Sequence, residues 1–168
     1  LNIVQMFSIS SALLCLLVTG FILTFAIVVM PGIAKLEDKD FLKAFQVTDG
    51  IIQGNQPLFL FIWLGSVISV LATMVSAVII PEFRDAWLII CVGGVYLIGV
   101  QGLTMAVHLP LNSRIKKLDI SKLDNEVVKK ERLNFENKWN FYNKIRTGIS
   151  FFVSLFFLSV ASLPSAWA

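Results

Sequence analysis

The sequence predicts an all-α integral membrane protein whose four transmembrane helices form one bundle spanning residues 1–168. Two observations predict this fold class. The chain is 57% hydrophobic and only 15% charged, with a mean hydropathy of +0.80, which is too apolar for a soluble globule. Four apolar runs, at about residues 8–30, 57–80, 85–107 and 146–163, each approach the roughly 20 residues that a helix needs to cross a bilayer.

The prolines support the same boundaries. All five prolines stand at the edges of the apolar runs, where a helix can begin or end without losing an internal hydrogen bond. We therefore expect helices to begin or stop at these positions: Pro31, Pro57, Pro81, Pro110 and Pro164.

Positive charge predicts the orientation. Residues 31–56 and 108–146 hold thirteen of the fourteen Lys and Arg residues, and only Arg84 lies in the loop between the second and third runs. Because Lys and Arg stay on the cytoplasmic side, both termini should lie outside and the two basic loops in the cytoplasm, by default of a bacterial inner membrane. The basic face should contact anionic membrane lipids, and no motif indicates a nucleic acid as partner.

The first basic loop contains a short amphipathic helix, expected from Asp40 to Gln53. Phe41, Phe45 and Ile52 gather on one side, so this segment should lie in the membrane interface or cover the end of the bundle. Asp49 lies at the border of the two faces, and we interpret it as an ordinary solvated acid rather than a catalytic residue.

Small residues mark helix contacts within the second and third runs. Ser66, Ser69, Thr73 and Ser76 form one polar stripe, which predicts a packing surface rather than a ligand site. The third run carries Gly93, Gly94, Gly99 and Gly102 for close packing, and the short turn before it makes the two helices antiparallel neighbours.

Three polar residues end the third run. Gln101, Thr104 and His108 are spaced three and four apart and so share a helix face. Polar groups at this depth usually face the bundle interior, which predicts a polar pocket opening toward the cytoplasm. The alternative is that these side chains bond only to one another or to neighbouring backbone.

From about Asn125 the chain should form one long helix that extends from the cytoplasm into the fourth span, because neither Pro nor Gly interrupts it before Gly148. Phe135, Trp139, Tyr142 and Arg146 share a face of this helix, with Asn143 beside them. These residues predict either a ligand site or an interfacial anchor, because Trp and Tyr favour the headgroup level and Arg can reach it.

Generic catalytic signatures are absent. The sequence has no P-loop, GxGxxG, CxxC pair or HExxH motif, and one histidine with two cysteines in apolar runs cannot supply a bis-histidine haem or a structural zinc site. We therefore predict that the chain holds no metal and no cofactor of its own, so any chemistry should be cofactor-free or use a partner's cofactor. Few ionisable residues lie within the runs, which also disfavours a secondary transporter.

Several short strings stand out together along the chain: Gly20 and Phe25 with Val29-Met30-Pro31-Gly32; Phe45-Gln46 with Asn55-Gln56-Pro57 and Phe59; Pro110-Leu111-Asn112; and Trp139, Tyr142, Asn143 and Arg146. In their order and spacing these strings resemble the anthrone oxygenase-like family of small four-helix membrane proteins. The likeness covers most of the chain, and the family often has Trp where Tyr142 stands and Asn where His108 stands.

This resemblance implies that the protein, if an enzyme, is a cofactor-independent oxygenase acting on a flat aromatic or quinone-type molecule. Some members oxidise an anthrone to an anthraquinone with molecular oxygen. On that basis His108 is the candidate base, and Asn112, Asn143 and Arg146 would stabilise the enolate oxygen. The predicted substrate-binding residues are Gln101, Thr104, Trp139 and Tyr142.

Two other functions fit the sequence. The chain could be a non-catalytic subunit or assembly factor whose packing faces bind partner membrane helices or a second copy. It could also bind a lipid or quinone without turnover. In an enzyme, Asn112, Asn143 and Arg146 should converge on an accessible cavity, whereas in a subunit they should be buried in helix contacts or face lipid headgroups.

Overall fold

The computed structural model describes residues 2–80 and 86–162, and all regular secondary structure in this part of the chain is helical. Within these described residues, four helices are long and apolar enough to cross a membrane: Ile3–Ile33, Pro57–Ile79, Ala86–Lys116 and Asn125–Ser162. The predicted all-α, four-span membrane bundle is therefore confirmed. The turn at 81–85 with Arg84, the run's end at Leu163 and Pro164 lie outside the described residues.

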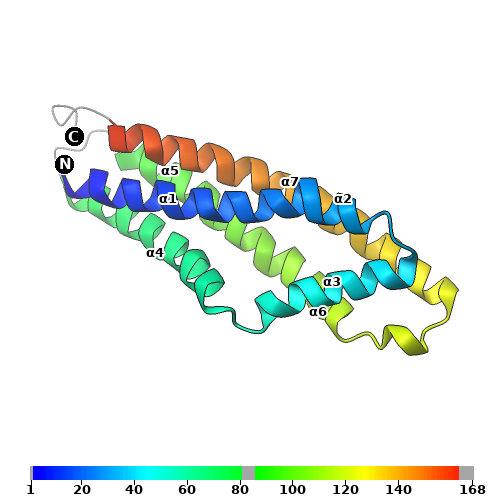
Figure 1. Cartoon of the computed structure of the whole chain (residues 1–168). Coiled ribbons are helices and arrows are strands. Elements are labelled where there is room, and N and C mark those ends of the chain that lie inside the picture. Colours follow the sequence, from blue (N-terminus) through cyan, green and yellow to red (C-terminus); the bar gives the residue numbers. More distant parts are fainter. Residues whose placement is uncertain (1, 81–85, 163–168) are drawn as a thin grey trace.

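The elements follow one another along two hairpins, shown in Figure 1. In chain order they are α1 (Ile3–Thr24), η1 (Phe25–Val29), α2 (Met30–Ile33), α3 (Asp38–Gln53), α4 (Pro57–Ile79), α5 (Ala86–Tyr96), η2 (Leu97–Gly102), η3 (Thr104–His108), α6 (Leu109–Lys116), η4 (Ile120–Lys122) and α7 (Asn125–Ser162). The segments η1, η2 and η3 are π-helical and η4 is a 3-10 turn.

Local chemistry sets several helix ends. Asn2 and Gln5 form a reciprocal capping box at the start of α1. Gln56 accepts a hydrogen bond from the backbone of Phe59, and Pro57 stands at the first turn of α4, as the sequence predicted. Asn55 has φ of 60°. This left-handed residue makes the corner at which α3 ends and α4 departs in a new direction.

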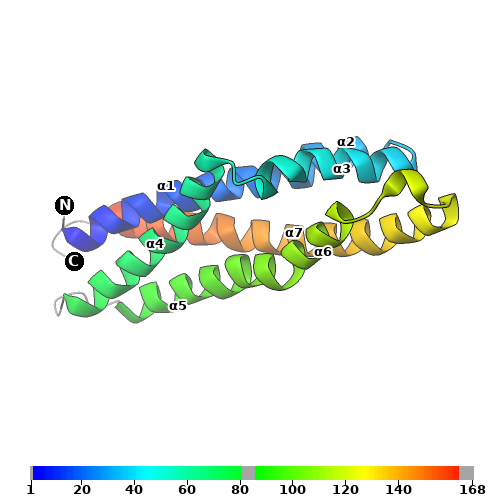
Figure 2. The ribbon, with the colours of Figure 1, turned by 90° about the horizontal axis from the view of Figure 1, so that it is seen from below.

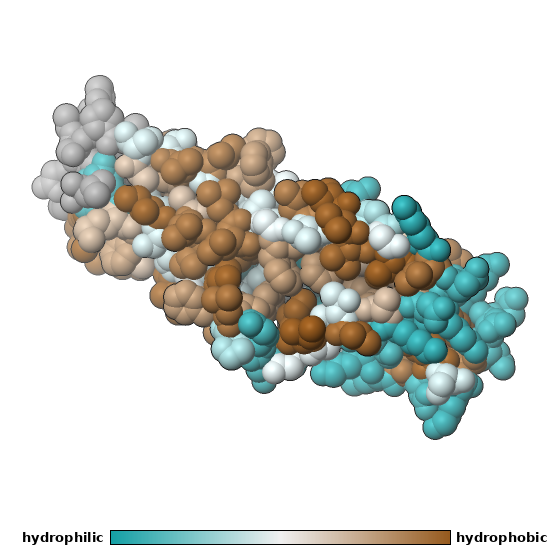
Figure 3. Space-filling view, viewed as in Figure 1, coloured by the Kyte–Doolittle hydropathy of each residue, from teal (hydrophilic) through white to brown (hydrophobic). Residues whose placement is uncertain are grey.

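The bundle is elongated, with polar and apolar ends. The helix α1 packs against α4 and α7, and α5 packs against α4 and α7. The segments α3, α6, η4 and the first half of α7 lie together at one end (Figures 1 and 2), which we call the charged end. Figure 3 shows hydrophilic residues gathered there and apolar residues along the rest of this face.

The polar stripe on α4 lies in helix contacts, as expected. Ser66, Ser69, Thr73 and Ser76 are all buried. The hydroxyl of Thr73 lies 2.9 Å from that of Ser11 on α1, and Tyr96 on α5 donates to Ser66 over 2.7 Å. Small hydroxyl side chains thus allow α1, α4 and α5 to approach closely.

Two of the four glycines in the third span lie at close helix contacts. A Cβ atom on Gly93 would stand 2.5 Å from Met74 Sδ, and one on Gly99 would stand 2.7 Å from Ile149 Cδ1. A Cβ atom on Gly94 would meet nothing within 4 Å. A methyl group at either of the first two positions would therefore require the side chain of Met74 or Ile149 to shift.

Pro31 and Pro110 do not end their helices, contrary to the prediction. In each case the helix widens into a five-residue π-helical segment and continues through the proline, ending at Ile33 and Lys116. The amide that closes each wide turn comes from the residue before the proline, Met30 to Phe25 and Leu109 to Thr104. Widening relieves the clash between the proline ring and the preceding turn, so the helix survives.

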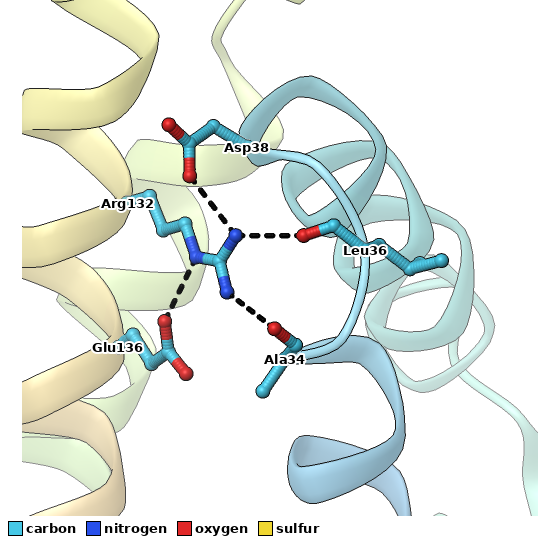
Figure 4. Close-up of polar contacts among 5 residues, drawn as sticks. All are labelled: Ala34, Leu36, Asp38, Arg132 and Glu136. Carbon is cyan, nitrogen blue, oxygen red and sulfur yellow. Dashed lines mark hydrogen bonds and ion pairs between the residues drawn. The ribbon is translucent and has the colours of Figure 1, made fainter.

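The charged end has its own core and a central arginine. A cluster that includes Phe41, Phe45 and Phe135 fills the space between α3 and α7. Arg132 lies against the face of Phe41 at 4.4 Å from the ring centroid. As Figure 4 shows, its guanidinium donates to the carbonyls of Ala34 and Leu36 and to the carboxylates of Asp38 and Glu136, all at 2.8–2.9 Å. Arg132 therefore fastens the loop between α2 and α3 to α7, and so positions α3.

Candidate functional site

A cavity of about 660 Å³ lies where the membrane-spanning helices meet α3. Its walls come from all four membrane-spanning helices and from α3. The lining residues are Phe21, Ile22, Phe25, Asp49, Ile52, Gln53, Asn55, Phe59, Leu60, Trp63, Leu64, Val67, Leu97, Gln101, Thr104, Met105, His108, Leu109, Asn112, Trp139 and Arg146. Its volume suits a molecule of several fused rings.

Aromatic side chains form one wall of the cavity. Phe21 on α1 lies 5.0 Å from Phe59 on α4, ring centroid to centroid, and Phe59 stacks on Trp63 at 5.2 Å with an interplanar angle of 28°. Phe25 extends this wall toward Trp139 at 5.7 Å. We did not predict Phe21 or Trp63 from the sequence, because an aromatic residue in an apolar run carries no signal of which side it faces.

Arg146 is buried in this wall and forms no ion pair with a described residue, although Asp49 lies near enough to interact with it electrostatically. Only 6% of the residue is exposed, and no carboxylate in residues 2–80 and 86–162 forms an ion pair with it. Its Nε donates to Asn143 Oδ1 over 2.9 Å, its Nη1 donates to Thr104 Oγ1 over 3.0 Å, and Nη2 makes no hydrogen bond to a described residue. A guanidinium in apolar surroundings therefore presents an unused donor edge.

Asn143 positions the side chain of Arg146 through a hydrogen bond. The residue is fully buried, and its Nδ2 donates to the carbonyl of Ile22 over 3.0 Å while its Oδ1 accepts from Arg146. It does not line the cavity. Asn143 thus fixes the guanidinium against α1. Tyr142 also does not line the cavity; its half-buried ring lies beside Phe141 at 5.2 Å.

His108 lines the cavity with both ring nitrogens unpartnered. The ring is buried and lies edge-on to Trp139 at 5.1 Å, with an interplanar angle of 86°. Neither nitrogen reaches a described hydrogen-bond partner, although the main chain of Tyr142 lies near enough to act on the ring electrostatically. Buried polar atoms in proteins are nearly always hydrogen-bonded, so this imidazole has room for a partner from outside the chain.

Asp49, Asn112 and Trp139 form a chain of hydrogen bonds along the same cavity. Asn112 donates from Nδ2 to Asp49 over 2.7 Å and accepts at Oδ1 from the indole of Trp139 over 3.0 Å. Gln53 donates to the other oxygen of Asp49. The arrangement joins α3, α6 and α7, and it orients both the amide and the indole.

The interpretation of Asp49 as a solvated acid was wrong. The residue is buried, because it follows Phe41 and Phe45 at intervals of four and so shares their inward face. Burial raises the pKa of Asp49 above its ordinary value of 3.8, against the opposing effects of Gln53, Asn112 and the positive charges of Lys116 and Arg146. The sequence signal was this spacing, which we did not use.

The two remaining predicted residues belong to polar networks at the cavity. Gln101 donates from Nε2 to the hydroxyl of Tyr96 over 3.2 Å, so it continues the contact between Tyr96 and Ser66. Thr104 donates to the carbonyl of Val100 over 2.7 Å while it accepts from Arg146. Both side chains are therefore held by neighbours, and both line the cavity.

The structure thus gathers six of the eight predicted site residues around one cavity: Gln101, Thr104, His108, Asn112, Trp139 and Arg146. Asn143 and Tyr142 lie outside its lining, and the roles of all eight stay predictions. Each π-helical segment contributes lining residues, a pattern common at functional sites. Among the residues that the structure describes, no cluster of three His, Cys, Asp or Glu side chains could hold a metal ion.

A family model described as anthrone oxygenase matches residues 56–156, which include α4, α5, the η2–η3–α6 segment and most of α7. No curated protein and no solved structure matches the chain. The match covers most of the cavity walls but leaves out α1, η1 and α3, which supply Phe21, Phe25 and Asp49.

Proposed function

Because the chain belongs to the anthrone oxygenase family, we propose that it binds a flat, hydrophobic aromatic or quinone-type molecule in the cavity and oxidises it with molecular oxygen, without a cofactor. One observation carries this proposal: Arg146 and His108 are buried at the same apolar cavity and neither has its polar atoms satisfied by the described chain. A ligand that bears an oxygen on an aromatic framework supplies the missing partner.

The proposed reaction removes two hydrogens from one ring carbon and places one oxygen there. His108 accepts the acidic C–H proton, and the resulting carbanion, delocalised onto the ring oxygen as an enolate, attacks molecular oxygen. The peroxide anion takes a proton back. Loss of the second C–H proton then breaks the O–O bond, so that a carbonyl forms on the substrate and the other oxygen atom leaves as water.

Arg146 stabilises the negative charge in this proposal. Its unused Nη2 edge faces the enolate oxygen as charge develops there, in surroundings with little water to screen it. Asn143 positions the guanidinium, while Asn112 orients Trp139, which stacks on the ring system of the ligand. Gln101 and Thr104 lie at the polar end of the ligand. Tyr142 has no assigned contact in this scheme, so its role in substrate binding stays a prediction.

The orientation predicted from charge completes the proposal. The charged end carries the basic loops, so it faces the cytoplasm, by default across a bacterial inner membrane, with both termini outside. Lipid headgroups contact the exposed lysines of this end. The alternative role, a non-catalytic subunit that binds partner helices or a second copy, predicts Asn112, Asn143 and Arg146 within helix contacts. Asn143 does lie in such a contact, with α1, whereas Asn112 and Arg146 line the cavity, and the position of these two residues favours the ligand.

Oxygen uptake tests the proposed function. The protein in lipid nanodiscs is mixed with a hydroxylated anthrone, and the rate is corrected for autoxidation with empty nanodiscs. We expect His108→Ala to lower the protein-dependent rate by about 10²–10⁴-fold, as for loss of a general base. The control is Ser154→Ala, whose hydroxyl lies on α7 but outside the cavity lining. Full turnover by His108→Ala would overturn the assignment of the base.

A further inference from the structure

Hydrogen bonds join α3 to the α6 region at the charged end, the side toward which the sequence predicted the pocket to open. The helices α3 and α6 are tied together there by Gln46, whose Nε2 donates to the carbonyls of Ile115 over 2.7 Å and Leu118 over 3.0 Å. The bond from Asn112 to Asp49 closes the next turn. Behind these contacts lies the packed core of the charged end, which includes Phe45, Ile115 and Trp139. A ligand arriving from water would have to separate α3 from this core.

The cavity is open on its lateral side. Three lining residues are well exposed: Leu64 on α4 at 56%, Met105 on η3 at 65% and Leu109 on α6 at 49%. All three are apolar, and they come from the two helices on either side of the opening. Asn55, also exposed, stands at the corner between α3 and α4.

The arrangement of the helices explains this opening. The helices α4 and α5 pack together at the end away from α3, and α4 then diverges from the η3–α6 segment until it meets α3 at Asn55 (Figures 1 and 2). The rim residues Leu64 and Met105 belong to helices that are long and apolar enough to span a membrane. The opening therefore faces hydrocarbon rather than water.

We propose that this opening is a lateral portal, through which the aromatic ligand enters the cavity from the hydrocarbon of the bilayer between Leu64 on one side and Met105 and Leu109 on the other. The inference rests on the proposed function, since it takes the same ligand. The occupant is an oxygen-bearing aromatic molecule dissolved in the membrane. A lipid acyl chain fits the apolar rim, but it would leave Arg146 and His108 at the inner end without a partner.

A bulky side chain at the rim tests the portal. The protein is reconstituted into vesicles that contain the hydroxylated anthrone under anaerobic conditions, and binding is followed by the fluorescence of the probe. We expect Met105→Trp to slow association and dissociation together, each by about tenfold, while the equilibrium affinity changes little, because a gate alters the path and not the bound state. The rate should follow the probe concentration in the lipid, not that in water.

The matched control is Ile98→Trp. Ile98 lies on the same spanning helix and is 77% exposed, but it does not line the cavity. Unchanged rates in Met105→Trp, or equal slowing by Ile98→Trp, would overturn the portal while wild-type binding upholds the proposed function. Absence of probe binding to the wild type would overturn both. A phospholipid that co-purifies and resists displacement by the probe would make an acyl chain the occupant and would contradict the portal.

Discussion

Two groups of buried polar side chains in this protein differ in how they are satisfied. On α4, the hydroxyls of Ser66, Ser69, Thr73 and Ser76 each donate to a backbone carbonyl three or four residues earlier, over 2.7–3.1 Å. At the cavity, the imidazole of His108 has no hydrogen-bond partner within the described chain, and Arg146 has an unused donor edge and no ion pair there.

This difference separates structure from function. Without water in the hydrocarbon layer, a polar group must be satisfied by the protein or remain costly. The α4 stripe needs nothing beyond its own helix and its neighbours, so it serves packing. The cavity groups are held in place by Asn143 and Trp139 yet left incomplete, as expected where a ligand supplies the last contacts.

Loss of the guanidinium should give the largest effect. We expect Arg146→Met to weaken binding of the hydroxylated anthrone by about 10²-fold, because a hydrogen bond from a charged donor is worth about 1.5–3 kcal/mol. The measurement is equilibrium titration in nanodiscs. Arg114→Met is the control, since Arg114 lies outside the cavity lining and its side chain, paired with Glu131, is largely exposed. Equal affinity of the wild type and Arg146→Met for the anthrone would contradict the view that the polar groups at the cavity, unlike the α4 stripe, serve ligand binding.

A close helix contact away from the cavity should affect stability instead. A methyl group on Gly99 would lie 2.7 Å from Ile149 Cδ1, so this flexible side chain must change its rotamer, and Gly99→Ala should be less stable than Gly94→Ala by about 0.5–1.5 kcal/mol. In Gly94→Ala the new methyl group has no neighbouring atom within 4 Å, so this variant should create no steric clash. Thermal unfolding in detergent compares the pair. Equal midpoints would show that the contact between the third and fourth spans is not tight.

The stripe itself should contribute modestly. Thr73→Val removes the hydroxyl that lies 2.9 Å from Ser11, and we expect a loss of about 0.6 kcal/mol, the average for such bonds between membrane helices. Ligand affinity should not change. A change in affinity with no change in unfolding midpoint would contradict the assignment of the stripe to packing.

Asp49 should give the smallest effect, and one that depends on pH. Burial raises its pKa above 3.8, so the folded protein binds the carboxyl proton more tightly than the unfolded chain. Stability of the wild type therefore falls as the pH rises through the interval between 3.8 and the folded-state pKa, and is constant above it. Asp49→Asn does not titrate.

The variant's stability relative to the wild type should thus increase with pH across that interval and then level off. Unfolding midpoints of both proteins over a series of pH values give this difference, in which other titrating groups cancel. If the difference in stability between the variant and the wild type is independent of pH, or decreases as the pH rises, then the pKa of Asp49 is not raised in the folded state.

The sequence predicted the spans because long apolar runs have few alternatives in a chain of this composition. It also predicted α7 as one long helix, since no Pro or Gly interrupts residues 125–147, and the structure confirms a helix of 38 residues, Asn125–Ser162. The short α3 was predicted from its apolar spacing and is confirmed as Asp38–Gln53. These features depend on local sequence alone.

Features that depend on the direction of a helix face were harder to predict. On α7 the buried face holds Asn143 with Phe135, Trp139 and Arg146, and Tyr142 lies to one side, half buried. Pro31 and Pro110 were expected to end helices, but a π-helical turn before each absorbs the clash. The cavity arises from the divergence of α4 from η3, which no local pattern encodes. At these prolines the sequence offered a different signal, because the strings Pro31-Gly32 and Pro110-Leu111-Asn112 resemble those of a family.

Mass spectrometry of the gently solubilised protein tests the central claim most directly. Our account predicts that an oxygen-bearing aromatic small molecule co-purifies with the wild type and with Thr73→Val, and is lost from Arg146→Met. A wild-type protein that carries stoichiometric partner polypeptides and no such molecule would contradict the account, and would identify the helix faces rather than the cavity as the functional surface.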